Sequence, residues 1–140
     1  MATMRTLAIV GVVMATASAV AMAATWRPVV LMHGLMSGAS AMSHAQGWIA
    51  ADFPGIYTVS VEIGNGRDDS MLMEMNKQVA SFAATVQRDR NLTKGFNLIG
   101  HSQGAMIARA YIERYSGNPK FPPVHNYISW AGPQDGVYGA

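Results

Sequence analysis

The feature that most constrains this chain is the pentapeptide Gly100-His101-Ser102-Gln103-Gly104. It follows the apolar run 96–99 and precedes residues 105–112, whose pattern is typical of a helix. A serine at the apex of a sharp turn between a strand and a helix is held in a strained backbone conformation, and glycines beside it let the strand and the helix approach closely. Ser102 is therefore the candidate nucleophile, with Gly100 and Gly104 as the glycines of its elbow.

Strand-like and helix-like segments alternate along the whole chain. Continuous apolar or β-rich runs predict strands, and these runs are residues 27–32, 56–63, 96–99 and 126–130. Apolar residues at helical spacing predict helices over 40–51 and 105–112. A third helix is predicted from an apolar stripe formed by Leu72, Met75, Val79, Phe82 and Val86. The alternation predicts an α/β fold with a doubly wound, mostly parallel sheet that ends one strand after the nucleophile helix.

Composition narrows the possible functions. The 140 residues include no cysteine, which excludes disulfides and thiolate metal sites, and their formal net charge is only +2. Hydrophobic residues make up 50% of the chain, as expected for a sequence that forms a core. No two histidines have metal-ligand spacing, and the basic residues lack the aromatic partners of a nucleic-acid surface. We therefore expect one globular domain with no metal, no cofactor and no nucleic-acid partner.

Two loops together resemble the α/β-hydrolases. His33-Gly34-Leu35 directly follows the first predicted strand, where enzymes of this fold place a loop that contributes one backbone N–H to the oxyanion hole. The residue after the nucleophile contributes the other. The resemblance implies an oxyanion hole made by the backbone N–H groups of Leu35 and Gln103. His33 is interpreted as a structural residue that braces its loop through hydrogen bonds.

The same resemblance assigns no triad Asp or His within this chain. Enzymes of this fold place the base after the final strand, downstream of the acid. His44, His101 and His125 do not occupy such a position, so each is interpreted as structural. Asp135 follows the last predicted strand, but the acid generally follows the next strand along. Five methionines that could line an acyl pocket are interpreted mainly as core and surface filler. They are Met36, Met42, Met71, Met73 and Met75.

Further segments resemble the palmitoyl-protein thioesterase family. The segments most particular to it are Pro54-Gly55-Ile56-Tyr57, Glu62-Ile63-Gly64 and Gly136-Val137-Tyr138-Gly139. Matches also occur at residues 30–35, 78–79 and 132–135, whereas the His-Gly loop and the Ser-Gln-Gly elbow are shared with many lipases. Two features depart from the family: His101 stands where many members have an aromatic residue, and the cysteines of animal members are missing. The family hydrolyses long-chain acyl thioesters on protein cysteines in lysosomes, so the resemblance implies S-acylated proteins or acyl thioesters as substrates.

The first two dozen residues have the organisation of a secretory signal. Arg5 precedes the apolar stretch 7–20, and Ala21-Met22-Ala23 has the small residues of a cleavage site. The alternative is an uncleaved membrane anchor, but the stretch is alanine-rich and short for a span. We expect residues 1–23 to be a signal peptide and 24–140 to be the amino-terminal part of an α/β-hydrolase domain. This predicts a secretory route to the lysosome or the exterior, or to the periplasm in a bacterium, without a stable membrane span.

Members of the thioesterase family are longer, and their triad Asp and His lie in the half that this sequence lacks. We therefore expect an amino-terminal half, from an incomplete or truncated gene product, that is inactive alone. The leading hypothesis is a serine thioesterase that acts through an acyl-enzyme on Ser102. The alternatives are a secreted lipase or carboxylesterase and a non-catalytic fragment. The sequence leaves open the acyl-chain and protein preference, the oligomeric state and glycosylation at Asn91.

Overall fold

Within residues 26–139, which the computed structural model describes, four strands form one sheet. The predicted signal peptide, residues 1–23, lies outside the described residues. The strands are β1 (Val29–Met32), β2 (Thr58–Val61), β3 (Phe96–His101) and β4 (Val124–Trp130). They are hydrogen-bonded in the order β2-β1-β3-β4, and every neighbouring pair is parallel. The predicted α/β fold, a doubly wound sheet of the α/β-hydrolase type, is confirmed.

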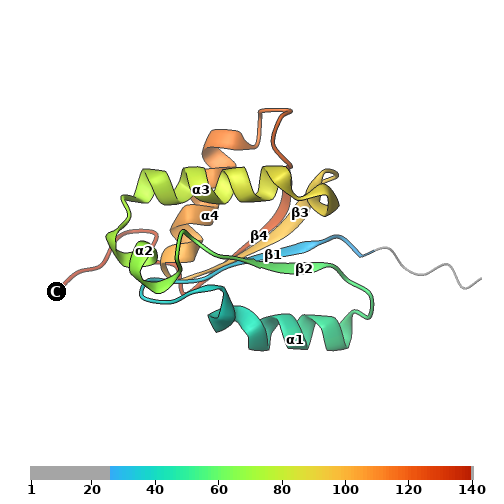
Figure 1. Ribbon diagram of the computed structural model, residues 1–140, viewed down its shortest axis with the longest axis horizontal. Coiled ribbons are helices and arrows are strands. Elements are labelled where there is room, and N and C mark those ends of the chain that lie inside the picture. Colours follow the sequence, from blue (N-terminus) through green and yellow to red (C-terminus); the bar gives the residue numbers. More distant parts are fainter. Residues whose placement is uncertain (1–25, 140) are drawn as a thin grey trace, which may run out of the picture.

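Helices cover the two faces of this sheet unequally. The helical segments are the 3₁₀ helix Ala39–Met42, α1 (Ser43–Asp52), α2 (Arg67–Leu72), α3 (Met75–Arg88), the 3₁₀ helix Arg90–Leu92 and α4 (Gln103–Tyr115). Figure 1 shows α3 and α4 on one face of the sheet and α1 on the other. We call the face beneath α3 and α4 the closed face, and the face on the α1 side the open face.

The closed face carries the main hydrophobic core. Val30 and Leu98 of the sheet pack there with Phe82 of α3 and Tyr111 of α4, and all of these residues are completely buried. The rings of Phe82 and Tyr111 meet edge to face, with their centroids 5.3 Å apart. The Tyr111 hydroxyl donates to the Pro122 carbonyl oxygen over 2.7 Å, and burial raises the pKa of this phenol well above its usual range. This face is therefore closely packed, and its buried hydroxyl has a partner.

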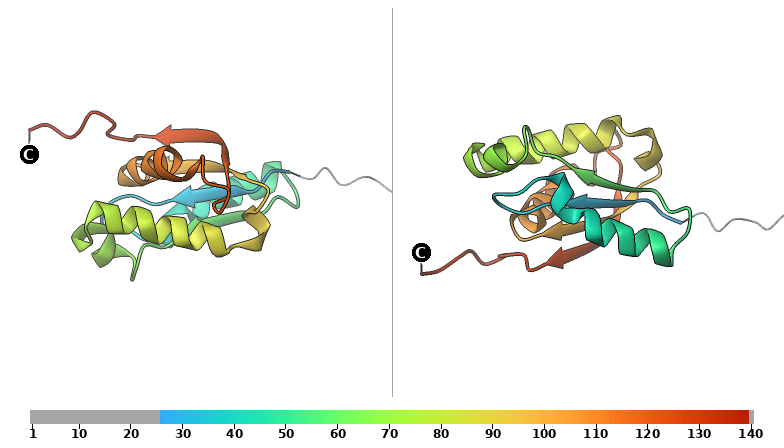
Figure 2. Two further views of the ribbon diagram at one scale, coloured as in Figure 1. Left: turned by 90° about the horizontal axis from the view of Figure 1, so that it is seen from above. Right: turned by 60° about the horizontal axis from the view of Figure 1, so that its bottom comes forward.

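The open face has a smaller core and a groove beside it. Ile49 of α1 packs against the cluster that contains Leu31 of β1. An apolar groove of about 440 Å³ continues along the sheet, with Phe53, Ile99 and Ile128 among its lining residues. Ile128, on the edge strand β4, is 55% exposed. Figure 2 shows β4 at the margin of the sheet, beyond the reach of α1, so this face is only partly covered.

The structure corrects the predicted apolar stripe that began at Leu72. Leu72 ends the short helix α2 and is 75% exposed, whereas α3 begins at Met75. The break has a local cause, because the Glu74 carboxylate caps α3 by accepting a hydrogen bond from the Asn76 backbone N–H. Trp48, one of the apolar residues at helical spacing that predicted the helix over 40–51, is likewise not part of the core: it is 64% exposed on α1.

Strand boundaries differ from the predicted ones by a few residues. The second strand is shorter at both ends than the predicted 56–63. The last strand begins at Val124, so His125 lies within β4 rather than before it. The third strand continues through His101, because His101 still pairs with Trp130 of β4. This extension carries β3 directly into the turn that holds the candidate nucleophile.

Candidate active site

Ser102 lies at the apex of the turn between β3 and α4. Its backbone has φ 54° and ψ −125°, a conformation that residues with a side chain rarely adopt. Two main-chain hydrogen bonds hold it there. The Ser102 N–H donates to the Trp130 carbonyl oxygen over 2.9 Å, and the Ser102 carbonyl accepts from the Ala105 N–H over 2.9 Å. The strain is thus maintained by β4 on one side and by the first turn of α4 on the other.

Both glycines of the turn lie where no side chain fits. A Cβ on Gly100 would lie 2.5 Å from the Cα of Ala105, in the first turn of α4. A Cβ on Gly104 would overlap the carbonyl oxygens of Met32 and His33. The end of β1 therefore packs directly on the start of α4, and this contact brings the loop after β1 to Ser102.

That loop is braced by a buried histidine. His33 is 1% exposed; its Nε2 accepts from the Ile63 backbone N–H over 3.4 Å. Its Nδ1 lies 2.9 Å from the Gly34 carbonyl oxygen, so hydrogen bonds at both ring nitrogens hold the ring in one orientation. This agrees with the bracing role expected for His33. A Cβ on Gly34 would lie 3.0 Å from the Ser102 Cβ, so the braced loop lies against Ser102.

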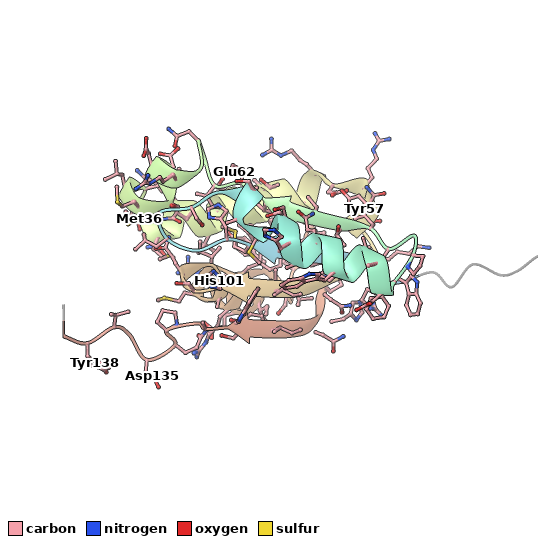
Figure 3. All side chains as sticks on the ribbon, turned by 90° about the horizontal axis from the view of Figure 1, so that it is seen from below. Met36, Tyr57, Glu62, His101, Asp135 and Tyr138 are labelled. Atoms are coloured by element: carbon pink, nitrogen blue, oxygen red, sulfur yellow. The ribbon has the colours of Figure 1, made fainter. Side chains whose placement is uncertain are left out.

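Glu62 braces the same loop from the end of β2. Its Oε2 accepts from the Ala39 backbone N–H over 2.5 Å, and the Ser60 hydroxyl donates to the Ala39 carbonyl over 2.9 Å. Figure 3 shows the labelled Glu62 and Met36 toward the same end of the sheet. The sequence drew attention to Glu62 only through the Glu-Ile-Gly resemblance, because a carboxylate that binds main-chain N–H groups leaves no periodic signal.

Both residues expected to form the oxyanion hole adjoin the Ser102 turn. Leu35 follows the glycine that touches Ser102, and its side chain is 48% exposed. Gln103 is the first residue of α4, a position whose backbone N–H has no acceptor within the helix. Met36, next to Leu35, has φ 56° and is 49% exposed. Backbone N–H groups in such a turn and at a helix start are suited to binding a developing negative charge.

Residues with strained backbone conformations lie near the carboxyl ends of the strands. Among residues 26–139, the non-glycine residues with positive φ are Met36, Ser102 and Ala131, which follow β1, β3 and β4. From β1 the chain passes to β2 on one side of β1, and it then crosses over to β3 on the other side. The order of strands therefore switches direction between the two central strands β1 and β3. Ligands of open α/β sheets bind at the carboxyl ends of the strands that flank such a reversal. Ser102 and the His33 loop lie there.

The remaining histidines and Asp135 do not join Ser102 in a triad. The ring of His101 packs against Trp130, with centroids 5.1 Å apart. His44 lies exposed on α1, and His125 Nε2 is 3.3 Å from the Lys94 carbonyl oxygen. Figure 3 shows Asp135 on the segment that follows β4, and no hydrogen bond or ion pair joins its carboxylate to a histidine within residues 26–139.

The methionines have mixed surroundings. Met42 is 3% exposed and belongs to the open-face core, while Met73 and Met75 are partly buried against the closed-face core. Met36 and Met71 are 49% and 45% exposed. The first group therefore fills core space, and the second is available at the surface.

Within the described part of the chain, no metal cluster or membrane-spanning helix accompanies the site. Among residues 26–139, no cluster of three or more His, Cys, Asp or Glu side chains is arranged to hold a metal ion. Over the same described part, no helix combines the length and the apolar character that crossing a bilayer requires.

A strained serine between a central parallel strand and a helix, with a braced glycine loop against it, has the geometry of the strand–turn–helix elbow of α/β-hydrolases. A family model described as palmitoyl protein thioesterase matches residues 28–140. The chain belongs to the palmitoyl protein thioesterase family.

Individual relatives agree with this membership. The chain is 50% identical over 123 residues to palmitoyl-protein thioesterase 3 of Dictyostelium discoideum, covering 88% of this chain and 41% of that relative. It is 29% identical to palmitoyl-protein thioesterase 1 of Caenorhabditis elegans, covering 81% of this chain and 39% of the relative. It is 29% identical to human lysosomal thioesterase PPT2, covering 83% and 37%. The chain thus spans about two fifths of the length of these relatives.

One functional candidate, Gln78, was noted in the sequence only as part of the family match at residues 78–79, with no role assigned. Gln78 of α3 is only 2% exposed and its Oε1 accepts from the Gln103 side chain over 2.9 Å. The available signal was a polar residue directly before Val79 in an otherwise apolar stripe. Nothing in the local pattern shows which residue it contacts, since Gln103 lies on another helix.

Proposed function

We propose that the full-length protein carrying this chain is a serine thioesterase that removes palmitoyl or similar long acyl groups from protein cysteines. The observation that carries the proposal is the strained Ser102 at the reversal point of the sheet, with Gly34 packed against it. The names of its relatives, palmitoyl-protein thioesterase and lysosomal thioesterase, supply the substrate class.

In the proposed reaction, Ser102 Oγ attacks the carbonyl carbon of the thioester. A base takes the hydroxyl proton as the C–O bond forms, and the C–S bond then breaks. The cysteine leaves as a thiol after receiving the proton, and the acyl group stays on Ser102 as an ester. Water then attacks this ester and releases the fatty acid and the free serine. The histidine and the carboxylate of the triad would come from the part of the protein outside this chain.

The tetrahedral intermediate carries negative charge on the former carbonyl oxygen. We assign its stabilisation to the backbone N–H groups of Leu35 and Gln103, which flank Ser102. Leu35 and Met36 belong to the loop that contacts Ser102 through Gly34, and their apolar side chains are about half exposed, so we place the start of the acyl chain along them. No side-chain chemistry is required of Leu35 itself for the oxyanion role.

A lysosomal or other secretory destination fits this substrate class. The human relative is named a lysosomal thioesterase, and so is a relative from Drosophila melanogaster that is 31% identical over 132 residues. We propose that residues 1–23 direct the protein into the secretory pathway as a signal peptide.

The decisive variant is Ser102→Ala in the full-length protein. We expect kcat for a palmitoylated cysteine peptide to fall by at least about 10³-fold, with the circular dichroism spectrum and melting temperature unchanged. Ser116→Ala, at the exposed end of α4, is the matched control and should keep full activity. Turnover retained by Ser102→Ala would refute the assignment.

A second candidate, a lipase or carboxylesterase, is favoured by one observation, His101 directly before the nucleophile. The same assay decides between them when the thioester is compared with an oxygen ester of the same acyl chain. A thioesterase should give the higher kcat/KM with the thioester, and a lipase with the oxygen ester.

A further inference from the structure

A pair of glutamine side chains links the nucleophile turn to the junction of α2 and α3. Gln103, the residue after Ser102, donates through Nε2 to the Ser70 carbonyl oxygen over 2.7 Å and to Gln78 Oε1 over 2.9 Å. Gln78 donates through its own Nε2 to the carbonyl oxygens of Ser70, over 3.2 Å, and Met73, over 2.7 Å. We call Gln78 and Gln103 the glutamine pair.

The glutamine pair fits in only one orientation. Both N–H groups of each side-chain amide have a carbonyl acceptor, so turning either amide over would bring its oxygen against the carbonyl oxygen of Ser70. Gln78 is 2% exposed, so water cannot replace the lost partners. A fully bonded polar pair of this kind fixes one relative position of the segments that it joins.

The glutamine pair joins the start of α4, which follows Ser102, to the junction of α2 and α3. The position of the start of α4 matters for the proposed chemistry. Ser102 is strained at φ 54°, and such residues persist only where the surrounding structure over-determines them. The main-chain bonds to Trp130 and Ala105 hold Ser102 itself. Gln103, the first residue of α4 after that turn, is additionally held through its side chain.

We propose that Gln78 is a positioning residue: through the Gln103 side chain, it fixes the backbone N–H of Gln103 where the oxyanion forms. The inference rests on the proposed function. It also explains why Gln78, a polar residue, lies on the apolar face of α3. An apolar side chain there would add packing but would not orient Gln103. An error of about 1 Å in placing a catalytic group costs about 10²-fold in rate, so this orientation has a large effect on turnover.

The test uses the full-length protein with Gln78→Met, Gln103→Met and the double variant. Each single change should lower kcat by about 10-fold to 100-fold and change KM by less than about 2-fold, because the oxyanion is present only in the transition state. The double variant should lose about as much as one single variant, because both residues act on one N–H. Gln103→Met leaves Gln78 bonded to Ser70 and Met73, so it keeps the α2–α3 junction if Gln78→Met does not fold.

The matched control is Gln87→Met on the same helix. Gln87 also donates its side-chain amide to a backbone carbonyl, that of Lys120 over 3.1 Å, but far along α3 from the elbow. It should keep the wild-type kcat. A rise in KM at constant kcat, or single losses in kcat that multiply in the double variant, would overturn the positioning role and leave only a structural one.

A second readout separates this inference from the proposed function. If the wild-type protein hydrolyses neither thioester nor ester, the proposed function fails, and hydrogen exchange of the peptide containing Ser102 and Gln103 then decides the positioning role. Gln78→Met should speed that exchange by at least about 10-fold, because the turn opens more often, while Gln87→Met should not. Unchanged exchange in Gln78→Met contradicts the inference whatever the activity.

Discussion

The closed and the open face of the sheet differ in how completely they are built. On the closed face, Phe82 and Tyr111 are completely buried, and the Tyr111 hydroxyl has an acceptor. On the open face, Ile128 and Trp130 of β4 remain about half exposed, at 55% and 47%, beside an apolar groove. The turn that holds Ser102 is tied to the closed face through α4 and the glutamine pair, and to the edge strand β4 through the Ser102 N–H. Site geometry therefore depends on the well-packed closed face and also on the half-exposed strand β4.

The largest expected contrast comes from truncating one large apolar side chain on each face. Phe82→Ala should lower the free energy of unfolding by about 3–5 kcal/mol, because it leaves a cavity in a closely packed core. Ile128→Ala should cost less than about 1 kcal/mol, because its side chain is already half in water. Urea unfolding of the two full-length variants measures both. Equal losses would show that the open face is covered in the whole protein.

A smaller loss of stability is expected from a change at Gly104, where the start of α4 packs on the end of β1. Gly104→Ala places a methyl group against the Met32 and His33 carbonyl oxygens, so the end of β1 must move away from α4. We expect a loss of about 1–3 kcal/mol in unfolding free energy, together with a fall in kcat. Gly117→Ala is the control, since nothing lies within 4 Å of its added methyl group, and it should stay within about 0.5 kcal/mol of wild type. Gly104→Ala with normal stability and activity would contradict the close approach.

The smallest effect concerns one hydroxyl within the closed face. Tyr111→Phe removes the donor to Pro122 and should cost about 1–2 kcal/mol at neutral pH. The pKa of Tyr111 is raised in the folded state, so its contribution is fully present below the ordinary tyrosine pKa of about 10 and is lost as pH rises further. The stability difference between wild type and Tyr111→Phe should therefore shrink above about pH 10. A gap that widens with pH would mean that the phenol ionises in the folded protein.

The local sequence pattern was sufficient to predict the strands and helices, but not the contacts between them. The alternation of strands and helices and the glycines around Ser102 were readable, because β-rich runs and tight turns leave short-range signals. Leu72 and Trp48 were misplaced because helical spacing alone shows neither where a helix breaks nor how much of a helix a sheet covers. The glutamine pair could not be predicted, since Gln78 and Gln103 belong to different helices and meet only through the fold. The contact between Glu62 and Ala39 could not be predicted either, since the two residues are far apart in sequence and meet only in the folded chain.

The pairing of the strands also sets the order in which the turn around Ser102 can be assembled. Val29 of β1 lies beside Asn97 of β3, so the central pair closes only after all the intervening residues have been synthesised. The Ser102 N–H then needs the carbonyl of Trp130, which is made later still. Contacts between residues far apart in sequence slow folding, because the entropy of loop closure is lost before the contacts form. During synthesis on the ribosome, the nucleophile turn is therefore completed only after β4 has emerged from the exit tunnel.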